Sequence, residues 1–383
     1  MARGRTLALA GDMTPVRVLQ VLTCDGVGGT ENMVATLVER NDPRQVAPTV
    51  VTLDGPGPVA RRLSEHGICV RSLGGDGLLR AFVRLAGILR RERFDVVNAY
   101  GFKSPFVTRF LVRAIAPGSV FVSGVRGLHA SELERLDSLK ARFVLGLERL
   151  TWRLVDVYDA NSLGAVELLA DTGVDRRRLR FIPNGLDVEW WTPDSGGRSG
   201  SRPVVLSVAR FVPVKHHQDL LRAVAILRDR GVRLQLELIG DGPTLPAMRR
   251  LANELGIEEL VRFAGARDRD QVRDAMRRAD VFCLASLWEG MASSVMEAMA
   301  CGLPVVGTHV NGVAELVDDG RTGYLVPPQR PEIIATALER LVTDPREAFM
   351  LGAAGRERIC THFDVHNMVA AKEDLYVGLA AAR

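Results

Sequence analysis

The 383-residue sequence predicts an α/β protein of two domains, each built on a parallel sheet covered by helices. Short apolar runs alternate with longer helical patterns almost throughout the chain, which is typical of repeated strand–helix units. The alternation pauses once, at residues 194–203 (DSGGRSGSRP), a stretch rich in Gly, Ser and Pro. That composition indicates a linker or exposed loop between two domains.

The first domain is expected over residues 15–193, after a disordered N-terminus at 1–14. Its predicted strands cover residues 16–22, 46–53, 95–99, 120–123 and 157–160. Its predicted helices cover residues 30–40, 78–91, 105–115 and 133–154. In the helix at 78–91, the apolar residues Leu79, Phe82, Val83 and Ala86 are expected on one side.

The second domain is expected over residues 203–363, after a linker at 194–202. Its predicted strands cover residues 204–208, 234–239, 261–263 and 281–284, and its predicted helices cover 245–255 and the region of 295–301. Ligands of such sheets bind beyond the carboxyl ends of the strands. Two sheets with facing ends would therefore place a binding site in a central cleft.

Composition excludes several classes of protein. The net charge of +4, from 50 basic and 46 acidic residues, is too small to indicate a nucleic-acid-binding protein. No apolar stretch approaches the roughly 18 residues of a membrane span. The five cysteines are odd in number, widely spaced and lack a C-x-x-C pair, which argues against disulfides or a zinc site. We expect a cytoplasmic protein, either soluble or peripheral to the inner face of the cell membrane.

Residues 287–308 contain two glutamates, Glu289 and Glu297, separated by seven residues. Ser293 or Ser294 can cap a helix whose first turns hold Glu297, and Gly302 suits the position just past its end. The start of that helix would present N–H groups and a positive dipole to a diphosphate. Glu297 could then accept hydrogen bonds from a ribose diol. The alternative is a capping box, in which Glu297 only satisfies a backbone N–H.

The loop after the predicted strand 204–208 carries two cations, Arg210 and Lys215. Two cations this close together at a strand end suit a diphosphate, whose negative charge they can neutralise. The alternative is a pair of solvated surface charges. Their position at the carboxyl end of a strand favours the binding role.

The stretch LWEGMASSVMEAMACGLPVVGT at 287–308 resembles the retaining glycosyltransferases of the GT-B fold, most closely glycosyltransferase family 4 (glycosyl transferases group 1). That family has a Glu, seven residues and a second Glu in an E-A-M-A-x-G-x-P-V-V setting, which Glu289 and residues 297–306 reproduce. Further matches run in family order from about residue 16 to 370. The resemblance implies two Rossmann-like domains facing a central cleft, with the C-terminal helix at 364–383 crossing back to pack on the first domain.

The resemblance also implies roles for individual residues. It gives catalytic roles to His129, Arg210, Lys215 and Glu289. It implies that Glu297 binds the ribose, Glu289 the donor sugar, and the backbone at Ser294 and Val295 the diphosphate. The substrate-binding residues that it implies are Gly28, Gly29, Glu31, Arg126, Gly265, Ala266, Arg267, Gly290, Met291, Ser293, Ser294, Val295 and Glu297.

Two departures from the family pattern limit what can be carried over. Residues 291–293 (Met-Ala-Ser) stand where the family often has a proline, which leaves the choice of donor sugar open. Asn98 and Tyr100 stand where some relatives have an H-x-H element, which leaves the acceptor chemistry open. His129, on the loop after the strand at 120–123, is either the functional histidine of that loop or a structural one.

The resemblance implies transfer with retention of configuration, without a metal or other cofactor. The expected partners are a nucleotide-sugar donor, with UDP or GDP as the nucleotide, and a glycan or polyprenol-linked acceptor of cell-surface polysaccharide biosynthesis. The predicted helix at 133–154 has a basic amphipathic face that either contacts anionic lipid or is solvated.

Other classes remain as alternatives. They are a sugar-nucleotide epimerase or a phosphorylase-like enzyme on a similar fold, a dinucleotide-dependent dehydrogenase, and a non-catalytic sugar-nucleotide-binding subunit. Glu31 breaks the G-x-G-x-x-G pattern that a dehydrogenase would need. The Glu289–Glu297 pair with Arg210 and Lys215 disfavours the epimerase and the phosphorylase.

Overall fold

The computed structural model describes residues 14–23, 29–55, 57–74, 77–101, 103–126, 146–194 and 202–383. The chain forms two compact units. The first is drawn from Met1–Val125, Leu150–Asp159 and Val369–Arg383, and the second from Arg126–Arg149 and Ala160–Met368. Residues 160–193 are grouped with the second unit, although residues 179–181 among them form a strand of the first sheet. Most of the N-terminal segment and linker predicted at 1–14 and 194–202 lies outside the described residues.

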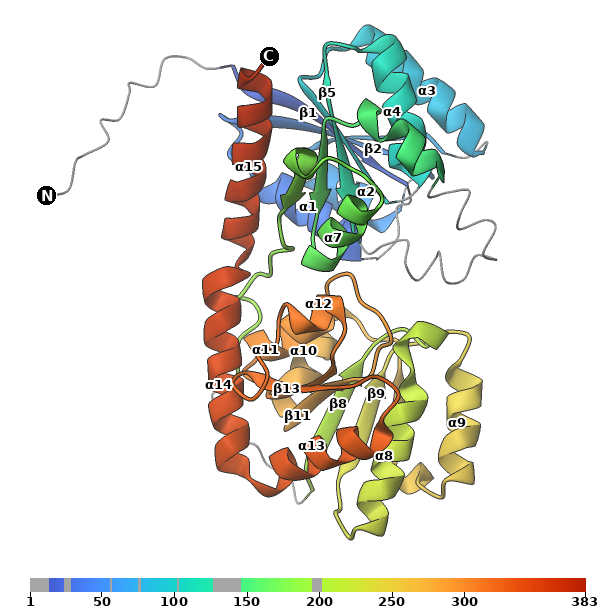
Figure 1. The fold of residues 1–383 in the computed structure, drawn as a ribbon, viewed down its shortest axis with the longest axis vertical. Helices are drawn as coiled ribbons and strands as arrows, with labels where there is room; N and C mark the ends of the chain where they lie inside the picture. The colour runs from blue at the N-terminus through green and yellow to red at the C-terminus, as the bar shows by residue number, and fades with distance from the viewer. Residues whose placement is uncertain are drawn as a thin grey trace, which may run out of the picture. The chain divides into compact units, whose positions relative to one another are not determined.

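Two parallel sheets confirm the predicted α/β class (Figure 1). The first sheet has the strand order β3-β2-β1-β4-β5-β6-β7. Its strands are β1 (Val16–Leu22), β2 (Val46–Thr52), β3 (Cys69–Ser72), β4 (Val96–Tyr100), β5 (Val120–Val125), β6 (Val157–Ala160) and β7 (Leu179–Phe181). Strand β1 pairs with both β2 and β4, so the order reverses there, as it does in doubly wound folds.

The second sheet has the strand order β10-β9-β8-β11-β12-β13. Its strands are β8 (Val204–Val208), β9 (Gln235–Ile239), β10 (Val261–Gly265), β11 (Val281–Leu284), β12 (Val305–Thr308) and β13 (Gly323–Val326). Strands β8 and β11 lie at the centre, where the order reverses again. Both strands are largely buried because helices cover both faces of the sheet.

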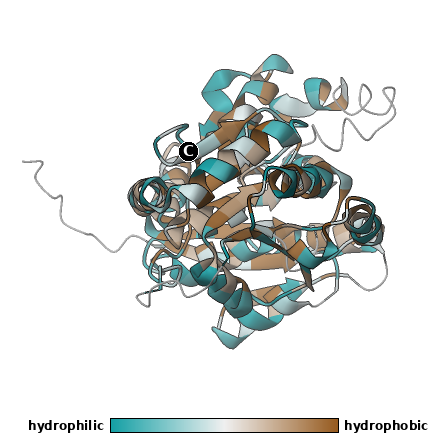
Figure 2. Ribbon diagram, turned by 90° about the horizontal axis from the view of Figure 1, so that it is seen from below, coloured by the Kyte–Doolittle hydropathy of each residue, from teal (hydrophilic) through white to brown (hydrophobic). Residues whose placement is uncertain are grey.

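Helices connect the strands and turn their apolar faces to the sheets (Figure 2). The connections of the first sheet include α1 (Gly29–Arg40), α2 (Pro58–Glu65), α3 (Leu78–Arg91), α4 (Lys103–Ile115), η1 (Trp152–Leu154), α7 (Leu163–Asp171) and η2 (Arg176–Arg178). Around the second sheet lie η3 (Pro213–Lys215), α8 (His217–Asp229), α9 (Leu245–Glu254), η4 (Glu258–Leu260), α10 (Arg269–Arg278), α11 (Ser293–Ala300), α12 (Asn311–Ala314), α13 (Pro331–Thr343) and α14 (Pro345–His362), and the chain ends in α15 (Val365–Ala381).

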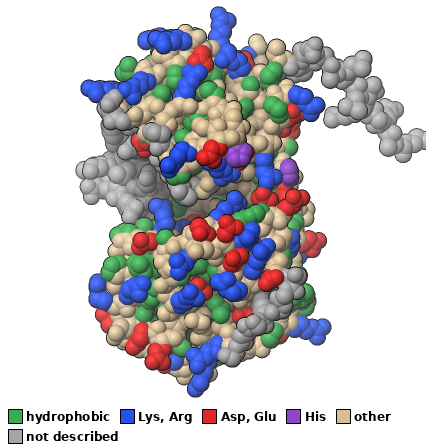
Figure 3. Space-filling view, turned by 180° about the vertical axis from the view of Figure 1, so that it is seen from behind, with side chains coloured by type: hydrophobic (Ala, Val, Ile, Leu, Met, Phe, Trp, Pro, Cys, Tyr) green, Lys and Arg blue, Asp and Glu red, His purple; other side chains and the backbone are tan. Residues whose placement is uncertain are grey.

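Helix α3 buries only part of the apolar side that the sequence predicts. Phe82 and Ala86 are buried as expected, but Leu79 is 80% exposed and Val83 is 66% exposed. Leu79 and Val83 thus lie at the solvent-facing edge of that side. Apolar residues surround most of this helix, so their spacing does not select one arc. In Figure 3, Lys and Arg side chains gather at the upper left of the first unit, the side on which α3 lies.

Helix α15 contributes its residues from Val369 onward to the first unit. Tyr376 is buried in the core with valines of β1 and β4. Its hydroxyl accepts a hydrogen bond from Asn98 Nδ2 at 2.8 Å. Lys372 and Asp159 form an ion pair in which both side chains are fully buried. The end of the chain is thus built into the interior of the first unit.

The helix predicted at 133–154 is described only in part. Residues 146–151 are helical and run into η1, and the rest of the prediction up to residue 145 lies largely outside the described residues. Among the described helices, none combines the length and apolar character that crossing a membrane requires.

Candidate active site

The loop after β8 holds the two predicted cations. Arg210 is exposed, and Lys215 ends the short 3-10 helix η3. The turn after β9 holds this loop in place, because the N–H of Phe211 donates to the carbonyl oxygen of Asp241 at 2.8 Å. A Cβ at Gly240 would collide with the carbonyl oxygen of Ala209, and one at Gly242 would collide with that of Phe211. These two glycines therefore let the turn support the backbone of the cation loop.

His216 follows Lys215 with a left-handed backbone, at φ 48°. A non-glycine residue is strained in this region. The His216 ring compensates by binding Asp219, with Nδ1 and Oδ2 2.7 Å apart. His217 beside it is buried and stacked on Phe211, with ring centroids 4.1 Å apart. Burial and the nearby Lys215 lower the pKa of His217 to about 4, so this ring is neutral at pH 7.

Lys215 and Glu289, which lie 74 residues apart in sequence, are joined directly. Lys215 Nζ lies 2.5 Å from Glu289 Oε1, and Ser286 Oγ donates to the same oxygen at 2.6 Å. The N–H of Leu287 donates to the carbonyl oxygen of Val214 at 2.8 Å, which ties the two loops together. No described residue donates to Glu289 Oε2. That oxygen is therefore available to accept a hydrogen bond from a ligand hydroxyl.

Helix α11 begins without a side-chain cap. Its N-cap is Ala292, so the expectation that Ser293 or Ser294 caps it was wrong. The N–H of Val295 donates to the carbonyl oxygen of Ala292 at 2.9 Å. Among the described residues, no acceptor is found for the N–H groups of Ser293 and Ser294, so these two are the donors open to an anion. Gly302 follows the helix with φ 76°, as the sequence predicts.

The approach to α11 is held by a glycine that sequence reasoning did not select. The N–H of Ala292 donates to the carbonyl oxygen of Gly312 at 3.2 Å. A Cβ on Gly312 would strike the peptide between Gly290 and Met291. The Met291 side chain is buried, and its Sδ accepts from the N–H of Asn184 at 3.2 Å. Only the backbone of Met291 is thus suited to meet a donor substrate.

Glu297 lies in the second turn of α11 and is half-buried. The capping box does not form, and no described residue donates to its carboxyl group. Desolvation raises the pKa of Glu297 to about 7, and Arg269 at the start of α10 opposes this rise. The guanidinium of Arg269 lies 4.3 Å from the ring centroid of Trp190. The carboxyl group of Glu297 is therefore desolvated, and no described residue donates a hydrogen bond to it.

Residues 265–267 lie at the end of the edge strand β10. Gly265 closes β10 with φ 73° and is half-buried, and Ala266 and Arg267 are exposed. The N–H of Gly240 donates to the carbonyl oxygen of Gly265 at 2.9 Å. The second unit thus carries these residues on the same sheet as the cation loop, one strand further out than β9.

Two family models match this sequence. Glycosyltransferase Family 4 matches residues 27–190, and Glycosyl transferases group 1 matches residues 191–358. The chain belongs to glycosyltransferase family 4.

Known relatives agree with this assignment. The chain is 32% identical over 303 residues to N-acetyl-alpha-D-glucosaminyl L-malate synthase of Bacillus anthracis, a match that covers 76% of this chain and 77% of the relative. It is 33% identical over 220 residues to the GDP-mannose-dependent alpha-(1-6)-phosphatidylinositol monomannoside mannosyltransferase of Mycolicibacterium smegmatis, covering 54% of this chain. That match spans 58% of the mannosyltransferase, little more than half its length.

Solved structures show the GT-B fold. The crystal structure of Anabaena Alr3699/HepE in complex with UDP-glucose superposes with a TM-score of 0.81 at 20% identity. The superposition covers 96% of this chain and 100% of that one. The two parallel-sheet units of this family 4 chain are therefore the two α/β domains of a GT-B protein.

The first unit of this family 4 member offers fewer described candidates. Gly28 and His129 lie outside the described residues. Gly29 begins α1 and is exposed, and Glu31 is buried in its first turn. Arg126 is half-buried directly after β5.

Asn98 and Tyr100, which replace the H-x-H element of some relatives, are buried in a polar network. Asn98 Nδ2 donates to the Tyr100 hydroxyl at 2.9 Å, and that hydroxyl donates to Gln20 Oε1 at 3.0 Å. Tyr376 of α15 joins the same network. These residues therefore anchor the C-terminal helix.

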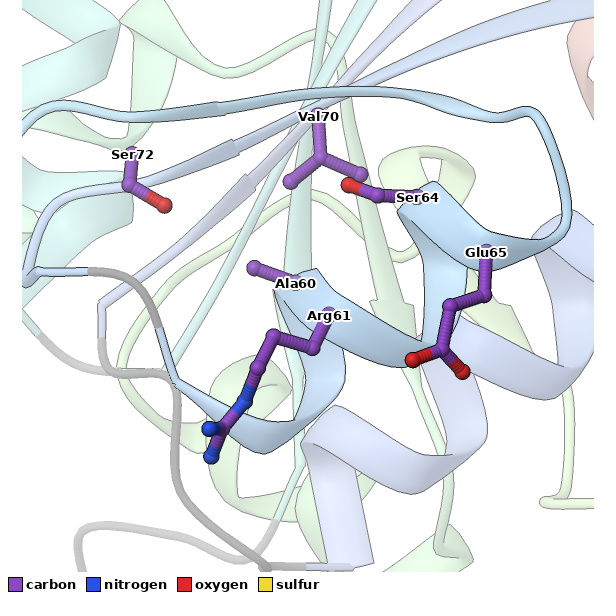
Figure 4. Close-up of a pocket in the computed structure, with 6 residues that line it drawn as sticks. All are labelled: Ala60, Arg61, Ser64, Glu65, Val70 and Ser72. Atoms are coloured by element: carbon purple, nitrogen blue, oxygen red, sulfur yellow. The ribbon is translucent and has the colours of Figure 1, made fainter.

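Two cavities in the described residues lie away from the predicted site. One of about 400 Å³ lies between α2 and β3, where Figure 4 shows Ser64 and Val70 on its wall and the charged ends of Arg61 and Glu65 along α2. Another of about 470 Å³ lies between α7 and α12. None of the predicted site residues lines either cavity. Within the described residues no group of three or more His, Cys, Asp or Glu side chains is arranged to hold a metal.

Proposed function

We propose that this family 4 protein is a retaining, metal-independent glycosyltransferase that moves a sugar from a UDP- or GDP-sugar to a glycan or lipid-linked acceptor. The observation that carries the proposal is the Lys215–Glu289 ion pair, which joins the cation loop to the loop that leads into α11. This ion pair supports the proposal because it joins the cation that would bind phosphate directly to the carboxylate that would bind the sugar.

The donor would bind across this ion pair. Its diphosphate would accept hydrogen bonds from the N–H groups of Ser293 and Ser294 and face the exposed guanidinium of Arg210. Glu289 Oε2 would accept a hydrogen bond from a sugar hydroxyl, while Oε1 stays bonded to Lys215 and Ser286. Glu297 would accept from the ribose and so gain the partners that the protein does not supply.

The chemistry then rests on charge stabilisation. As the glycosidic bond breaks, negative charge grows on the leaving diphosphate, and Arg210, Lys215 and the helix N–H groups stabilise it. We propose a front-face displacement in which the leaving phosphate takes the acceptor proton, so no protein nucleophile is assigned. The relatives' names support this class of donor, since one is GDP-mannose-dependent and Anabaena Alr3699/HepE is in complex with UDP-glucose.

A thermal-shift panel of UDP-, GDP- and ADP-sugars tests the proposal first. A ligand at 100 times its dissociation constant should add about 2.7 kcal/mol to the free energy of unfolding. Slow hydrolysis of the stabilising donor should follow, and it should vanish in Glu289→Ala but persist in Glu258→Ala, an exposed glutamate of the same unit. The anomeric configuration of the product, read by NMR with and without EDTA, tests retention and metal independence.

Two other outcomes would indicate a function other than glycosyl transfer. Stabilisation by a donor with neither hydrolysis nor transfer would indicate a non-catalytic sugar-nucleotide-binding subunit. Conversion of the donor sugar into its epimer without an acceptor would indicate an epimerase.

A further inference from the structure

The start of helix α8 holds a histidine and an aspartate in direct contact beside the cation loop. His216 Nδ1 lies 2.7 Å from Asp219 Oδ2, and the N–H of Asp219 donates to the carbonyl oxygen of His216 at 3.0 Å. The Asp219 side chain is 1% exposed and that of His216 is 12% exposed. His216 directly follows Lys215 in the chain, so this largely buried pair lies next to a predicted phosphate-binding cation.

Asp219 needs a compensating partner because its carboxylate is buried. Taking a carboxylate out of water is costly unless a cation or hydrogen-bond donors replace the water. Among the described residues, His216 is the only base that bonds Asp219. Lys215 is paired with Glu289, and His217 is buried and neutral at pH 7. The pair therefore offers a carboxylate beside which a positively charged ring can form.

Gln218 allows the His216 ring to hold either one or two protons. Its Nε2 lies 2.6 Å from His216 Nε2. In the neutral ring, Nδ1–H donates to Asp219, and the amide of Gln218 donates to the bare Nε2. In the charged ring, Nε2–H needs an acceptor, and Gln218 Oε1 provides one when the amide turns over. The ring can thus gain a proton without losing either hydrogen bond.

The charge of this ring would affect a ligand of the cation loop. In the free protein, the ammonium group of Lys215 opposes a second positive charge on the adjacent residue, because like charges repel. A diphosphate bound to the loop would favour that charge instead, because it brings negative charge. Histidine is the side chain that gains or loses a proton near neutral pH. Binding of the diphosphate and protonation of His216 would then promote each other equally.

We propose that His216 takes up a proton when a diphosphate binds to the cation loop, and so supplies a third positive charge beside Arg210 and Lys215. Both ring nitrogens are bonded within the protein, so the ring acts through its charge and through the loop, as a positioning residue. The strained backbone of His216 supports this role, since such strain clusters at binding sites. The inference rests on the proposed donor site.

The test is isothermal titration calorimetry of the full-length protein with UDP-glucose and GDP-mannose at pH 7.5, in buffers of low and high ionisation enthalpy. Neither diphosphate has a proton to lose near this pH, so the difference in heat between buffers counts the protons that the protein takes up. The wild type should take up part of one proton per bound donor. His216→Gln and Asp219→Asn should take up less.

The pH dependence of binding gives a second measurement. One proton taken up on binding lowers affinity by about tenfold for each unit of pH. From pH 7 to 8, the affinity of the wild type should therefore fall by roughly three- to tenfold more than that of His216→Gln. Glu297 titrates in both proteins, so its contribution cancels from this comparison.

Two further variants serve as controls. His362→Gln removes an exposed histidine of α14 and should match the wild type in both measurements. His216→Gly relieves the left-handed backbone and lacks the ring, so it should fold well and still take up less proton than the wild type. A role of His216 in stability alone predicts no difference in proton uptake between any of these proteins.

Three results would overturn the proposal. These are equal uptake by the wild type and His216→Gln, full uptake by His216→Gly, and a loss of uptake in His362→Gln as large as that in His216→Gln. Donor binding with equal uptake would contradict this inference and leave the proposed transferase function intact. Binding of neither donor by the wild type would contradict both.

Discussion

The two sheets of this family 4 protein use polar side chains in opposite ways. In the second unit, Arg210, Lys215 and Glu289 follow the ends of central strands, and each is left with some capacity for a ligand. In the first unit, Gln20 and Asn98 lie on the central strands β1 and β4, but they are buried and bonded to Tyr376 of α15. A polar residue on a central strand thus marks a binding site only when its hydrogen bonds are not already used inside the protein.

The largest expected effect is on the buried network of the first unit. Lys372→Met would leave Asp159 charged and buried without its cation. The free energy of unfolding should fall by about 3–5 kcal/mol, measured by urea denaturation. The exposed Arg383→Ala serves as the control. A loss below about 1 kcal/mol would contradict the assigned role of this ion pair, and Lys372→Met/Asp159→Asn should recover part of the loss.

In the second unit, Lys215→Met should affect turnover more than stability. Losing the cation that we propose to face the diphosphate should reduce kcat by about 10²–10³, or roughly 2.7–4 kcal/mol of transition-state stabilisation. Arg222→Met removes an exposed cation from α8 and should leave kcat unchanged. Steady-state kinetics with the donor found by thermal shift measures both. Equal losses in the two variants would argue against a specific phosphate site at Lys215.

At pH 8, Glu297→Gln should raise the stability of the protein and weaken its binding of the donor. The pKa of Glu297 in the folded protein, about 7, exceeds the ordinary value of 4.5, so the folded state holds a proton that the unfolded state releases between these two values. The free energy of unfolding should therefore fall by roughly 1–3 kcal/mol as pH rises from 4.5 to 7.

Glu297→Gln should remove that pH dependence, be more stable than the wild type at pH 8, and bind the donor more weakly. Denaturation from pH 4.5 to 8 and donor titration at pH 8 measure these effects. Tighter donor binding by the variant would contradict the proposed role of Glu297.

The smallest effect concerns the left-handed residue after Lys215. His216→Ala keeps the strained backbone and loses the bond to Asp219, so it should lower stability by about 0.5–1.5 kcal/mol. His216→Gly loses the same bond but relieves about 1 kcal/mol of strain, so it should lie close to the wild type. Chemical denaturation of both proteins tests this order. Equal stability of the two variants would mean that the backbone there is not strained.

The strand pattern and the main motif positions could be predicted from sequence because they depend on local features. Strands β1, β8, β11 and the helix after Glu289 are found from apolar runs and from a glutamate spacing that the chain displays directly. Helices α8, α10 and α13 carry regular apolar faces as well, but they are not among the predicted helices. The buried central strands β8 and β11 were sufficient to predict that the loop with Arg210 and Lys215 lies at a strand end.

Other features depend on contacts between distant residues. The bond between Lys215 and Glu289 joins positions 74 residues apart, and sequence places both only at strand ends. Ser286 and Gly312 act on the same loop, yet a serine and a glycine are too common to be selected without the fold. The start of α11 at Ala292 was missed because either serine satisfies the ordinary preference for a cap.

The discontinuous make-up of the first unit limits how this enzyme family can be recombined in the laboratory. A chimera that exchanges only residues before 160 for those of a relative would leave Lys372 and Tyr376 of the original chain facing a foreign interior. Swaps of the first unit should therefore transplant the last fifteen residues together with the N-terminal half. A gene fragment that ends before them would encode a protein whose central strands lack their polar counterparts.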